Sequence, residues 1–290
     1  MKYSESYKVQ PGHRVLLAQV DPDQTGDFHN KREIKKLIVK QTSRLKELQY
    51  LLYAESRRSL LVCLQAPDAG GKDGVIRHVF GCMNPQGCRV HAFKVPTPEE
   101  ASHDFLWRTH RAAPGKGEVV IFNRSHYEDV LPPRVHHSIP ESEWSKRYDA
   151  INDFECNLSG NSTLILKFYL HISREEQLRR FGKRLEDPAR HWKISEADYR
   201  ERSFWDDYQQ AYDDMLNRCS TPHAPWYVIP ANHKWFRNLI VSTIVVQQLE
   251  NLGMQMPEAS VDIEEIRRKF HCEKEDAFLS SAQAHASDED

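Results

Sequence analysis

Short runs of hydrophobic residues alternate along the chain with longer segments in which hydrophobic and polar residues recur at helical spacing. The short runs span residues 59–65, 89–95, 118–123, 163–172 and 226–230. Each is too brief for a stable helix, so each predicts a buried strand. The longer amphipathic segments predict helices over residues 31–56, 72–82, 98–112, 143–158, 173–185 and 235–252.

This alternation favours an α/β fold with a doubly wound parallel sheet. The helical segments between successive strands are long enough to cross over and cover both faces of such a sheet. We therefore expect a three-layer αβα sandwich with a central five-stranded parallel sheet. A charged and aromatic helical insertion at about residues 179–219, between the fourth and fifth strands, predicts a lid.

The chain is expected to divide into three parts. Residues 1–30 carry Pro11, Gly12, Pro22 and Gly26 among polar residues, which predicts an irregular arm lying on the body of the protein. Residues 31–257 form the main domain. Residues 258–290 predict a C-terminal helix and a polar tail, which is expected to fray over residues 273–290.

Composition changes this picture by excluding classes of protein. The formal net charge is -2, from 40 Lys+Arg against 42 Asp+Glu, so nothing global attracts nucleic acid or a membrane. An anionic substrate must therefore meet a local basic cluster. The six cysteines include no Cys-x-x-Cys pair, which is typical of a reducing compartment. Without an apolar leader or a bilayer-length apolar run, the chain is expected to be cytoplasmic, with neither nucleic-acid nor membrane partners.

The first candidate site is the loop after the first strand, QAPDAGGKDG at residues 65–74. It follows the P-loop pattern G-x-x-x-x-G-K-[ST], in which backbone N–H groups wrap a phosphate and the lysine, here Lys72, reaches its outer oxygens. Ala66 replaces the first glycine, and Asp73 replaces the Ser or Thr that normally binds Mg²⁺. The expected phosphate-binding or nucleotide-binding positions are Pro67, Ala69, Gly70, Gly71, Asp73 and Gly74.

This loop carries its own carboxylate, Asp68. A carboxylate and a phosphate repel each other at close range, but a divalent cation between them makes the contact attractive. We therefore assign Asp68 to Mg²⁺, in place of the missing Ser or Thr. Two plainer interpretations stay open: the segment is a glycine-rich turn with an exposed Lys72, and Asp73 is an acid favoured by the helix dipole.

The second candidate site is IFNRSHYEDVL, residues 121–131, at the end of the third strand. Ligands of doubly wound sheets lie beyond the carboxyl ends of the strands, so Asn123, Arg124, Glu128 and Asp129 are expected to face the loop. Because Asn123 stands where an Asp usually ends such a strand, Glu128 or Asp129 is expected to share metal binding with Asp68. Arg124 offers a planar fork for phosphate oxygens, and its alternative is a structural salt bridge.

Basic residues form two further candidate groups. The residues in the insertion are expected to close over phosphates and exclude water. The plainer interpretation is that they form a solvated charged face. These residues are Arg179, Lys183, Arg184 and Lys193. A looser set of basic residues brackets the carboxyl edge of the sheet and is expected to line a groove for a long polyanion. The alternative is that they are ordinary surface charges. The set contains Arg77, Lys94, Arg108 and Arg134.

The three segments together resemble the family-2 polyphosphate kinases, whose signatures look like A-x-D-x-x-G-K-D-G, F-N-R-S-x-Y-E-D-V and a basic lid helix. The resemblance runs from about residue 31 to residue 257 and includes NPQGCRVHAFKVPT, SHDFLWR and APWYVIPANHKWFRNL. It implies a P-loop kinase-like fold. It also implies transfer of the terminal phosphoryl group of inorganic polyphosphate to a nucleotide, with Mg²⁺ or alternatively Mn²⁺.

The resemblance further implies roles for individual residues and partners. The implied catalytic set is Asp68, Lys72, Asn123, Arg124 and Glu128. The F-N-R-S-H-Y-E-D form is similar to the group that phosphorylates both nucleoside mono- and diphosphates, so adenine or guanine nucleotides are the expected acceptors. A dimer or tetramer is expected. Two rival functions stay open, an ATP-dependent nucleotide kinase and a non-catalytic nucleotide-binding regulator.

Overall fold

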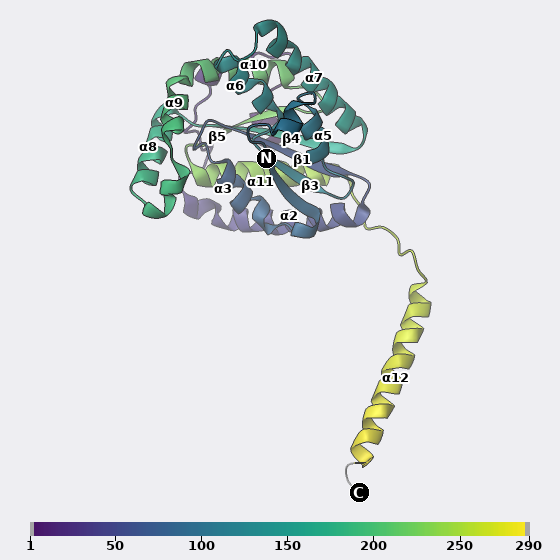
Figure 1. Ribbon diagram of the computed structural model, residues 1–290. Helices are drawn as coiled ribbons and strands as arrows, with labels where there is room; N and C mark the ends of the chain where they lie inside the picture. The colour runs from purple at the N-terminus through teal and green to yellow at the C-terminus, as the bar shows by residue number, and fades with distance from the viewer. Residues whose placement is uncertain (1–2, 288–290) are drawn as a thin grey trace. The chain divides into compact units, whose positions relative to one another are not determined.

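Five parallel strands form one sheet in the order β2-β3-β1-β4-β5 (Figure 1). The computed structural model describes the backbone of residues 3–287 and the side chains of residues 4–275. The strands are β1 (Ser59–Gln65), β2 (Cys88–Ala92), β3 (Val119–Asn123), β4 (Thr163–His171) and β5 (Trp226–Pro230). The predicted α/β fold with a five-stranded parallel sheet is confirmed.

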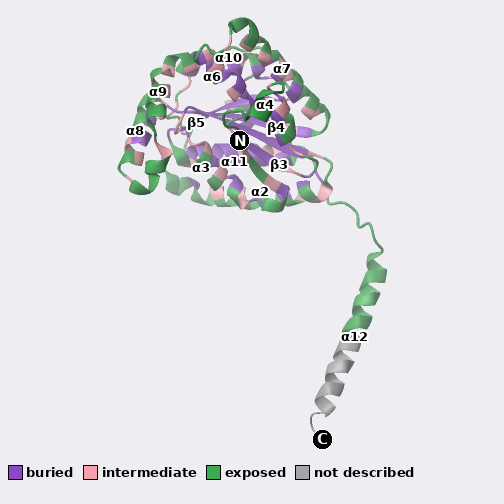
Figure 2. Ribbon diagram, in the orientation of Figure 1, coloured by how far each residue is buried: buried purple, intermediate pink, exposed green. Residues whose placement is uncertain are grey.

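Helices cover both faces of this sheet (Figure 1). One layer contains α2 (Lys31–Glu55), α3 (Lys72–His78) and α11 (Lys234–Asn251). The other contains α5 (Trp107–Ala112), α6 (Leu131–Val135), α7 (Glu141–Gly160) and α10 (Trp205–Cys219). Side chains of β1 alternate between the layers: Val62 packs in a hydrophobic cluster with residues of α2 and α11, and Cys63 packs in a different cluster on the opposite face. The strands of the sheet are buried between the two helical layers (Figure 2).

Central strands β1 and β3 set the position of the candidate site. They run in register, with Leu60 beside Val119 and Leu64 beside Asn123. Every residue of β1 is buried, as expected for a parallel strand covered on both sides. Because both strands end at the same edge, the segments that follow Gln65 and Asn123 emerge next to each other.

Three predicted elements differ in extent from the structure. The segment 98–112 is not one helix but two, α4 (Pro98–Ala101) and α5, because Asp104 accepts a hydrogen bond from the backbone of Leu106 and starts a new turn. Helix α3 ends at His78 rather than residue 82, and a 3₁₀ turn, η2 (Phe80–Cys82), follows it. Strand β2 covers only 88–92, and the turn η3 (Pro85–Gly87) precedes it.

The N-terminal arm is largely irregular but carries α1 (Tyr3–Tyr7) and the 3₁₀ turn η1 (Leu17–Gln19). Lys8 forms an antiparallel bridge with Tyr227, and the backbone N–H of Val9 donates to the carbonyl of Trp226 at 2.8 Å. The arm therefore covers part of the open edge of β5, which protects that edge from pairing with other chains.

The insertion between β4 and β5 divides into two parts. Helix α8 (Arg174–Leu185), the turn η5 (Pro188–Lys193) and α9 (Glu196–Ser203) precede α10. Met215 and Leu216 of α10 are fully buried in a hydrophobic cluster with Tyr148 of α7. Helix α10 thus belongs to the body of the protein, and the predicted lid is restricted to α8, η5 and α9.

Residues 1–255 and 256–290 form two separate compact units. The second unit contains α12 (Ile263–Ser287), so the predicted C-terminal helix is present and extends through most of the segment that was expected to fray. Across the part of the chain that the structure describes, no helix is long and apolar enough to cross a membrane.

Candidate functional site

The loop between β1 and α3 is held in a strained, tightly turned conformation. Ala69 has a φ of 58°, a left-handed value that costs energy for a residue with a side chain. The N–H of Gly70 donates to the carbonyl of Pro67 at 2.9 Å, closing a turn. A Cβ on Gly70 would lie 2.5 Å from the Cβ of Ala66, so only glycine fits. Such outliers cluster where a backbone is shaped to bind a ligand.

Lys72 begins α3 and folds back over this loop. Its Nζ donates to the carbonyl oxygen of Ala66 at 2.9 Å. Burial lowers the pKa of Lys72, and the neighbouring Arg124 lowers it further, although the carboxylates of Asp68 and Glu128 act in the opposite direction. Its ammonium group thus lies inside the loop, where an anion would restore a favourable environment.

Arg124 joins the two candidate segments. Its φ of 62° turns the chain sharply after β3. Its Nη2 donates to Oδ1 of Asp68 at 2.9 Å, and its Nη1 lies 3.7 Å from Oε2 of Glu128. The charge of Glu128 is the main cause that raises the pKa of Arg124, and Asp68 adds to it. The guanidinium therefore lies between a carboxylate of the loop and a carboxylate of the β3 segment.

Glu128 is positioned by its neighbours in the 3₁₀ turn η4 (His126–Asp129) and in β1. The side chain of Gln65, at the last position of β1, donates from Nε2 to Oε1 of Glu128 at 3.0 Å. Sequence reasoning missed Gln65. The feature of the sequence that could have indicated Gln65 is its position, since a polar residue that ends a buried strand lies at the ligand-binding edge of the sheet.

A second contact links the predicted lid to the loop. Asp73 accepts a hydrogen bond from Nδ2 of Asn123 at 3.0 Å and another from Nζ of Lys193 at 3.2 Å. Burial alone would raise the pKa of Asp73, but these two donors outweigh it and hold that pKa below its usual value. Asp73 therefore links α3 to the end of β3 and to η5. These contacts are more than an acid that only interacts with the helix dipole would make.

Helix α8 supports the loop through residues that were not among the predicted site residues. Nη1 of Arg180 donates to the carbonyls of Ala69 and Gly70 at 2.8 and 2.9 Å. Gln177 donates from Nε2 to the backbone carbonyl of Asp68 at 3.0 Å. Arg180 stood within the basic run of the insertion, but its burial and its backbone partners could not be read from that run.

Arg237 of α11 is a further residue that was not predicted. It is only 1 % exposed and its guanidinium packs against Gly71 and Gly74. The sequence signal was a charged residue inside the apolar helical segment Trp235–Val246, because a charge is seldom buried without a specific contact.

Two of the predicted site residues, Arg108 and Asp129, pair with each other. Nη2 of Arg108 donates to both carboxylate oxygens of Asp129, at 2.8 and 2.9 Å, and both side chains are buried. Nη1 of Arg108 also donates to the backbone carbonyl of Lys94. This buried ion pair occupies the groups that were expected to bind polyphosphate and metal, so it favours a structural role for both residues.

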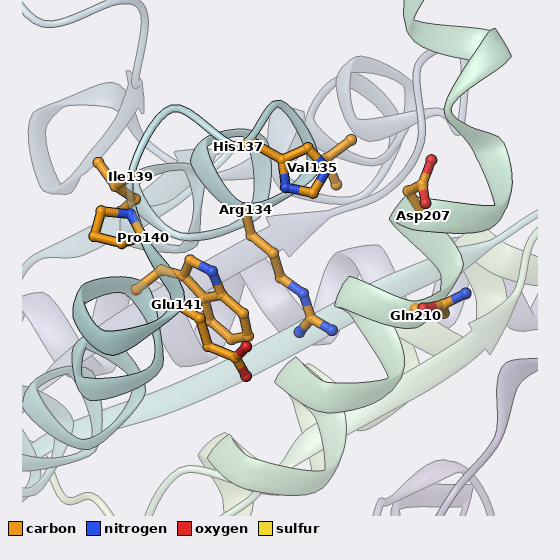
Figure 3. Close-up of a pocket in the computed structure, with 9 residues that line it drawn as sticks. Arg134, Val135, His137, Ile139, Pro140, Glu141, Asp207 and Gln210 are labelled. Atoms are coloured by element: carbon orange, nitrogen blue, oxygen red, sulfur yellow. The ribbon is translucent and has the colours of Figure 1, made fainter.

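Arg134 is also engaged away from the loop. It reaches from α6 toward α10 in a cavity of about 300 Å³ (Figure 3). There it forms an ion pair with Asp214 at 2.6 Å and lies over the ring of Trp144 at 4.5 Å. These contacts account for Arg134 without a polyanion.

The remaining predicted basic residues differ in their availability. Arg179 pairs with Glu176 at 2.5 Å, and Arg184 donates to the carbonyl of Lys193 at 2.7 Å, so both support the lid itself. The others are exposed and make no ion pair with any residue that the structure describes; they are Arg77, Lys94 and Lys183.

The donor set is suited to a hard divalent cation that is shared with substrate. Within residues 4–275, no cluster of three or more His, Cys, Asp or Glu side chains has the arrangement of a metal site. Mg²⁺ is usually bound by one or two carboxylates together with phosphate oxygens and water, so such a cluster is not required. Asp68 and Glu128, both in contact range of Arg124, are the two carboxylates that would hold such a cation.

Comparisons with known proteins show the family of this chain. Residues 28–257 match the sequence model of the family described as Polyphosphate kinase 2 (PPK2). The chain belongs to the polyphosphate kinase 2 family. It is 49% identical over 263 residues to the AMP/ADP-polyphosphate phosphotransferase of Meiothermus ruber, covering 90% of this chain and 98% of the relative. It is 43% identical over 269 residues to the ADP-polyphosphate phosphotransferase of Rhodopseudomonas palustris, covering 89% and 93%.

A solved member of the polyphosphate kinase 2 family shares the fold. The crystal structure of polyphosphate kinase 2 from Arthrobacter aurescens TC1 superimposes with a TM-score of 0.89 at 43% identity, covering 93% of this chain and 96% of that one. The matched family range contains the loop, the β3 segment and the α8–α9 insertion. The resemblance in the sequence was based on these three features, and all three lie within the domain that the family model covers.

Proposed function

We propose that this enzyme is a Mg²⁺-dependent phosphotransferase that moves the terminal phosphoryl group of inorganic polyphosphate to nucleoside mono- and diphosphates, AMP and ADP, reversibly. The observation that carries the proposal is Arg124 lying between Asp68 and Glu128. A guanidinium in contact with two carboxylates at the mouth of a phosphate loop is placed to meet a phosphoryl group and its metal ion.

Each residue has a role in this proposal. Asp68 and Glu128 hold the Mg²⁺, which neutralises phosphate charge when it is bound. The amides of the loop around Gly70 bind the phosphate oxygens, and Lys72 and Arg124 stabilise the charge on the group in transfer. Phosphoryl transfer demands positioning and charge neutralisation more than covalent help from the protein, and these side chains supply both.

Polyphosphate is proposed as the donor because it can be held by charge alone. The protein as a whole has a formal net charge of -2, so its attraction for a polyanion must be local. Arg77, Lys94 and Lys183 are exposed and without an ion-pair partner among the described residues, which leaves them free to bind successive phosphates. Arg108 and Arg134 are left out of this set because their ion-paired side chains are only 6 % and 17 % exposed, whereas the paired Arg124 is 45 % exposed.

AMP and ADP are proposed as acceptors because a similar protein is named for both nucleotides. The relative from Meiothermus ruber carries both nucleotides in its name and is 49% identical. In this chain Asn123, at the position that suggested such a dual acceptor, donates to Asp73 rather than to a metal-binding carboxylate. We propose that it fixes Asp73 at the start of α3.

The test is product formation from purified protein with AMP, long-chain polyphosphate and MgCl₂, with no nucleoside triphosphate added. We expect ADP first and ATP later, detected by ion-exchange chromatography, and no product after chelation with EDTA. An ATP-dependent nucleotide kinase would form ADP from AMP only when ATP replaces polyphosphate. Repeating the assay with MnCl₂ and with GMP or GDP defines the metal and the base.

A non-catalytic regulator makes a different prediction. It would bind nucleotide but give no product with either donor, and Asp68→Asn would leave binding unchanged. We also propose a cytoplasmic dimer or tetramer, which light scattering of the purified protein and immunoblotting of fractionated cells test directly.

A further inference from the structure

The loop has a buried positive charge behind it that pairs with no carboxylate of the described residues. Arg237 projects from the first turns of α11 and is 1 % exposed. Its Nε and Nη2 donate to Oδ1 of the adjacent Asn238, at 3.1 and 2.8 Å. Its Nη1 has no hydrogen-bond partner among the residues that the structure describes. A buried charge without a counter-ion is costly, so its presence requires an explanation.

The guanidinium fits against two glycines of the loop. A Cβ at Gly71 would collide with Nη1 of Arg237, and a Cβ at Gly74 would lie 2.8 Å from Nη2. Gly71 has a φ of 108°, so it is also the residue that turns the chain into α3. The two glycines thus leave the space that the guanidinium fills.

The surroundings of Arg237 increase the excess of positive charge. Burial and the nearby Arg180 lower the pKa of Arg237 to about 9, so the side chain stays protonated at neutral pH. Burial together with Arg180 and Arg237 also lowers the pKa of Lys234. Glu176 acts on the pKa of Lys234 in the opposite direction, but it already pairs with Arg179 and Arg180.

We propose that Arg237 is a positioning residue of the phosphate loop: its guanidinium buttresses Gly71 and Gly74 from behind, and its unbalanced charge is balanced when a polyphosphate anion occupies the loop. The inference rests on the proposed donor. It separates Arg237 from Lys72 and Arg124, because Arg237 acts through the loop backbone and does not touch the reacting phosphates. In the free protein the buried charge of Arg237 is energetically costly. Binding of the anion relieves this cost, and the anion therefore binds more strongly.

The experiment compares Arg237→Met and Arg237→Lys with a matched control, Arg57→Met. Arg57 is exposed, next to the amino end of β1, away from the loop. We expect Arg237→Met to raise KM for polyphosphate at least tenfold while KM for AMP changes less than threefold. Because an unpaired buried charge is removed, its Tm without ligand should equal or exceed that of the wild type. Arg237→Lys should recover most of the loss, since it retains the charge.

A binding measurement without turnover uses inorganic tripolyphosphate as the probe. We expect tripolyphosphate to raise the Tm of the wild type and of Arg57→Met equally, and to raise that of Arg237→Met by less than half as much. The proposal is overturned if KM for polyphosphate stays within twofold. It is equally overturned if both KM values rise together while the Tm of the free protein falls, because that pattern describes a purely structural residue. Lack of turnover by the wild type would reject the proposed function, and the tripolyphosphate shift would still decide the role of Arg237.

Gly74 provides a second test that does not depend on the Met variant being folded. Gly74→Ala places a methyl group against Nη2 of Arg237 and should raise KM for polyphosphate several-fold in the wild-type background. In the Arg237→Lys background, where the guanidinium is absent, the same substitution should have less than half of that effect. Gly160→Ala, at a helical glycine with no atom near its Cβ position, is the control. Equal effects of Gly74→Ala in both backgrounds would contradict the contact.

Discussion

Arg124 donates a hydrogen bond from Nη2 to Oδ1 of Asp68 at 2.9 Å, across the gap between the loop after β1 and the segment after β3. The contact joins a side chain that we propose for the moving phosphate to one that we propose for the metal ion. Because neither partner is fully buried, the pair can open when substrate and metal enter. Its contribution to the stability of the free protein should be small, about 1 kcal/mol or less.

Asp68→Asn should abolish most of the transfer activity. The amide keeps the size of the side chain but loses the negative charge that holds Mg²⁺, so we expect kcat to fall by about 100-fold or more. Steady-state assays with AMP and polyphosphate at saturating MgCl₂ measure this. Asp153→Asn, at an exposed position of α7, serves as the control and should retain wild-type rates. A variant at Asp68 with more than one tenth of wild-type kcat would refute the metal-binding role.

Arg124→Lys should behave as a severe change although it preserves charge. Lysine has no planar fork and cannot contact Asp68 and Glu128 at once, so we expect kcat to fall by about 100-fold, equivalent to about 2.7 kcal/mol of transition-state stabilisation. The free energy of unfolding should change by less than about 1 kcal/mol, because the pair is partly exposed. Urea denaturation and the transfer assay on the same preparation separate the two effects. A large loss of stability with unchanged kcat would point to the structural salt bridge instead.

Lys193→Gln should weaken closure of the insertion without changing stability. The residue donates to Asp73 at 3.2 Å on a largely exposed surface, so its loss should leave the Tm unchanged. We expect KM for the nucleotide or for polyphosphate to rise several-fold, with a weaker dependence on salt than in the wild type. Lys116→Gln, in the exposed turn before β3, is the control. Unchanged KM values at low salt would mean that this contact has no part in the lid.

The same contact has a defined dependence on pH. Because the pKa of Asp73 is below its usual value, the carboxylate stays charged throughout the neutral range. The link to Lys193 is therefore fully present above the ordinary pKa of an aspartate and is lost as pH falls through the lower pKa of the folded state. The KM difference between wild type and Lys193→Gln should thus be constant from about pH 6 to pH 8, because this range lies well above the ordinary pKa of an aspartate.

Lys167→Met should destabilise the protein strongly. Lys167 and Glu155 are fully buried, and Nζ lies 2.5 Å from Oε2 of Glu155. Removing the lysine leaves the carboxylate without its main partner, and loss of one member of a buried pair costs about 3–5 kcal/mol. Urea denaturation at pH 7 measures this. Lys167→Met combined with Glu155→Gln should recover more than half of the loss, and an equally unstable double variant would contradict the pairing.

The pH dependence of that variant follows from Glu155. Burial would raise the pKa of Glu155, but Lys167 and His126 outweigh it and hold the pKa below its usual value. The pair therefore stabilises the protein above the ordinary pKa of a glutamate, and this stabilisation is lost as pH falls through the lower folded pKa. Without Lys167 the pKa of Glu155 rises and this pH-dependent stabilisation is lost, so lowering the pH through the ordinary pKa of a glutamate should reduce the stability of the variant less than that of the wild type.

The sequence by itself determined the strands, the order of most elements and the loop. Strands such as β1 and β5 were predicted with their observed bounds because a short, continuous apolar run has few other stable states. The sequence also placed Asp68, Arg124 and Glu128 near one another, because the carboxyl ends of neighbouring parallel strands share an edge. In the structure β3 lies directly beside β1, and this order of strands brings the three side chains together.

The tertiary structure alone decided which charges meet. Arg108 and Asp129 were both placed near the substrate from their positions in the chain, yet they pair with each other. Arg180 and Arg237 come from helices far along the chain, yet they lie behind Gly70, Gly71 and Gly74. Local patterns fix the backbone through short-range hydrogen bonding and periodic burial. The partner of a long charged side chain depends on which elements pack beside it, and that information is not present at any single stretch of the sequence.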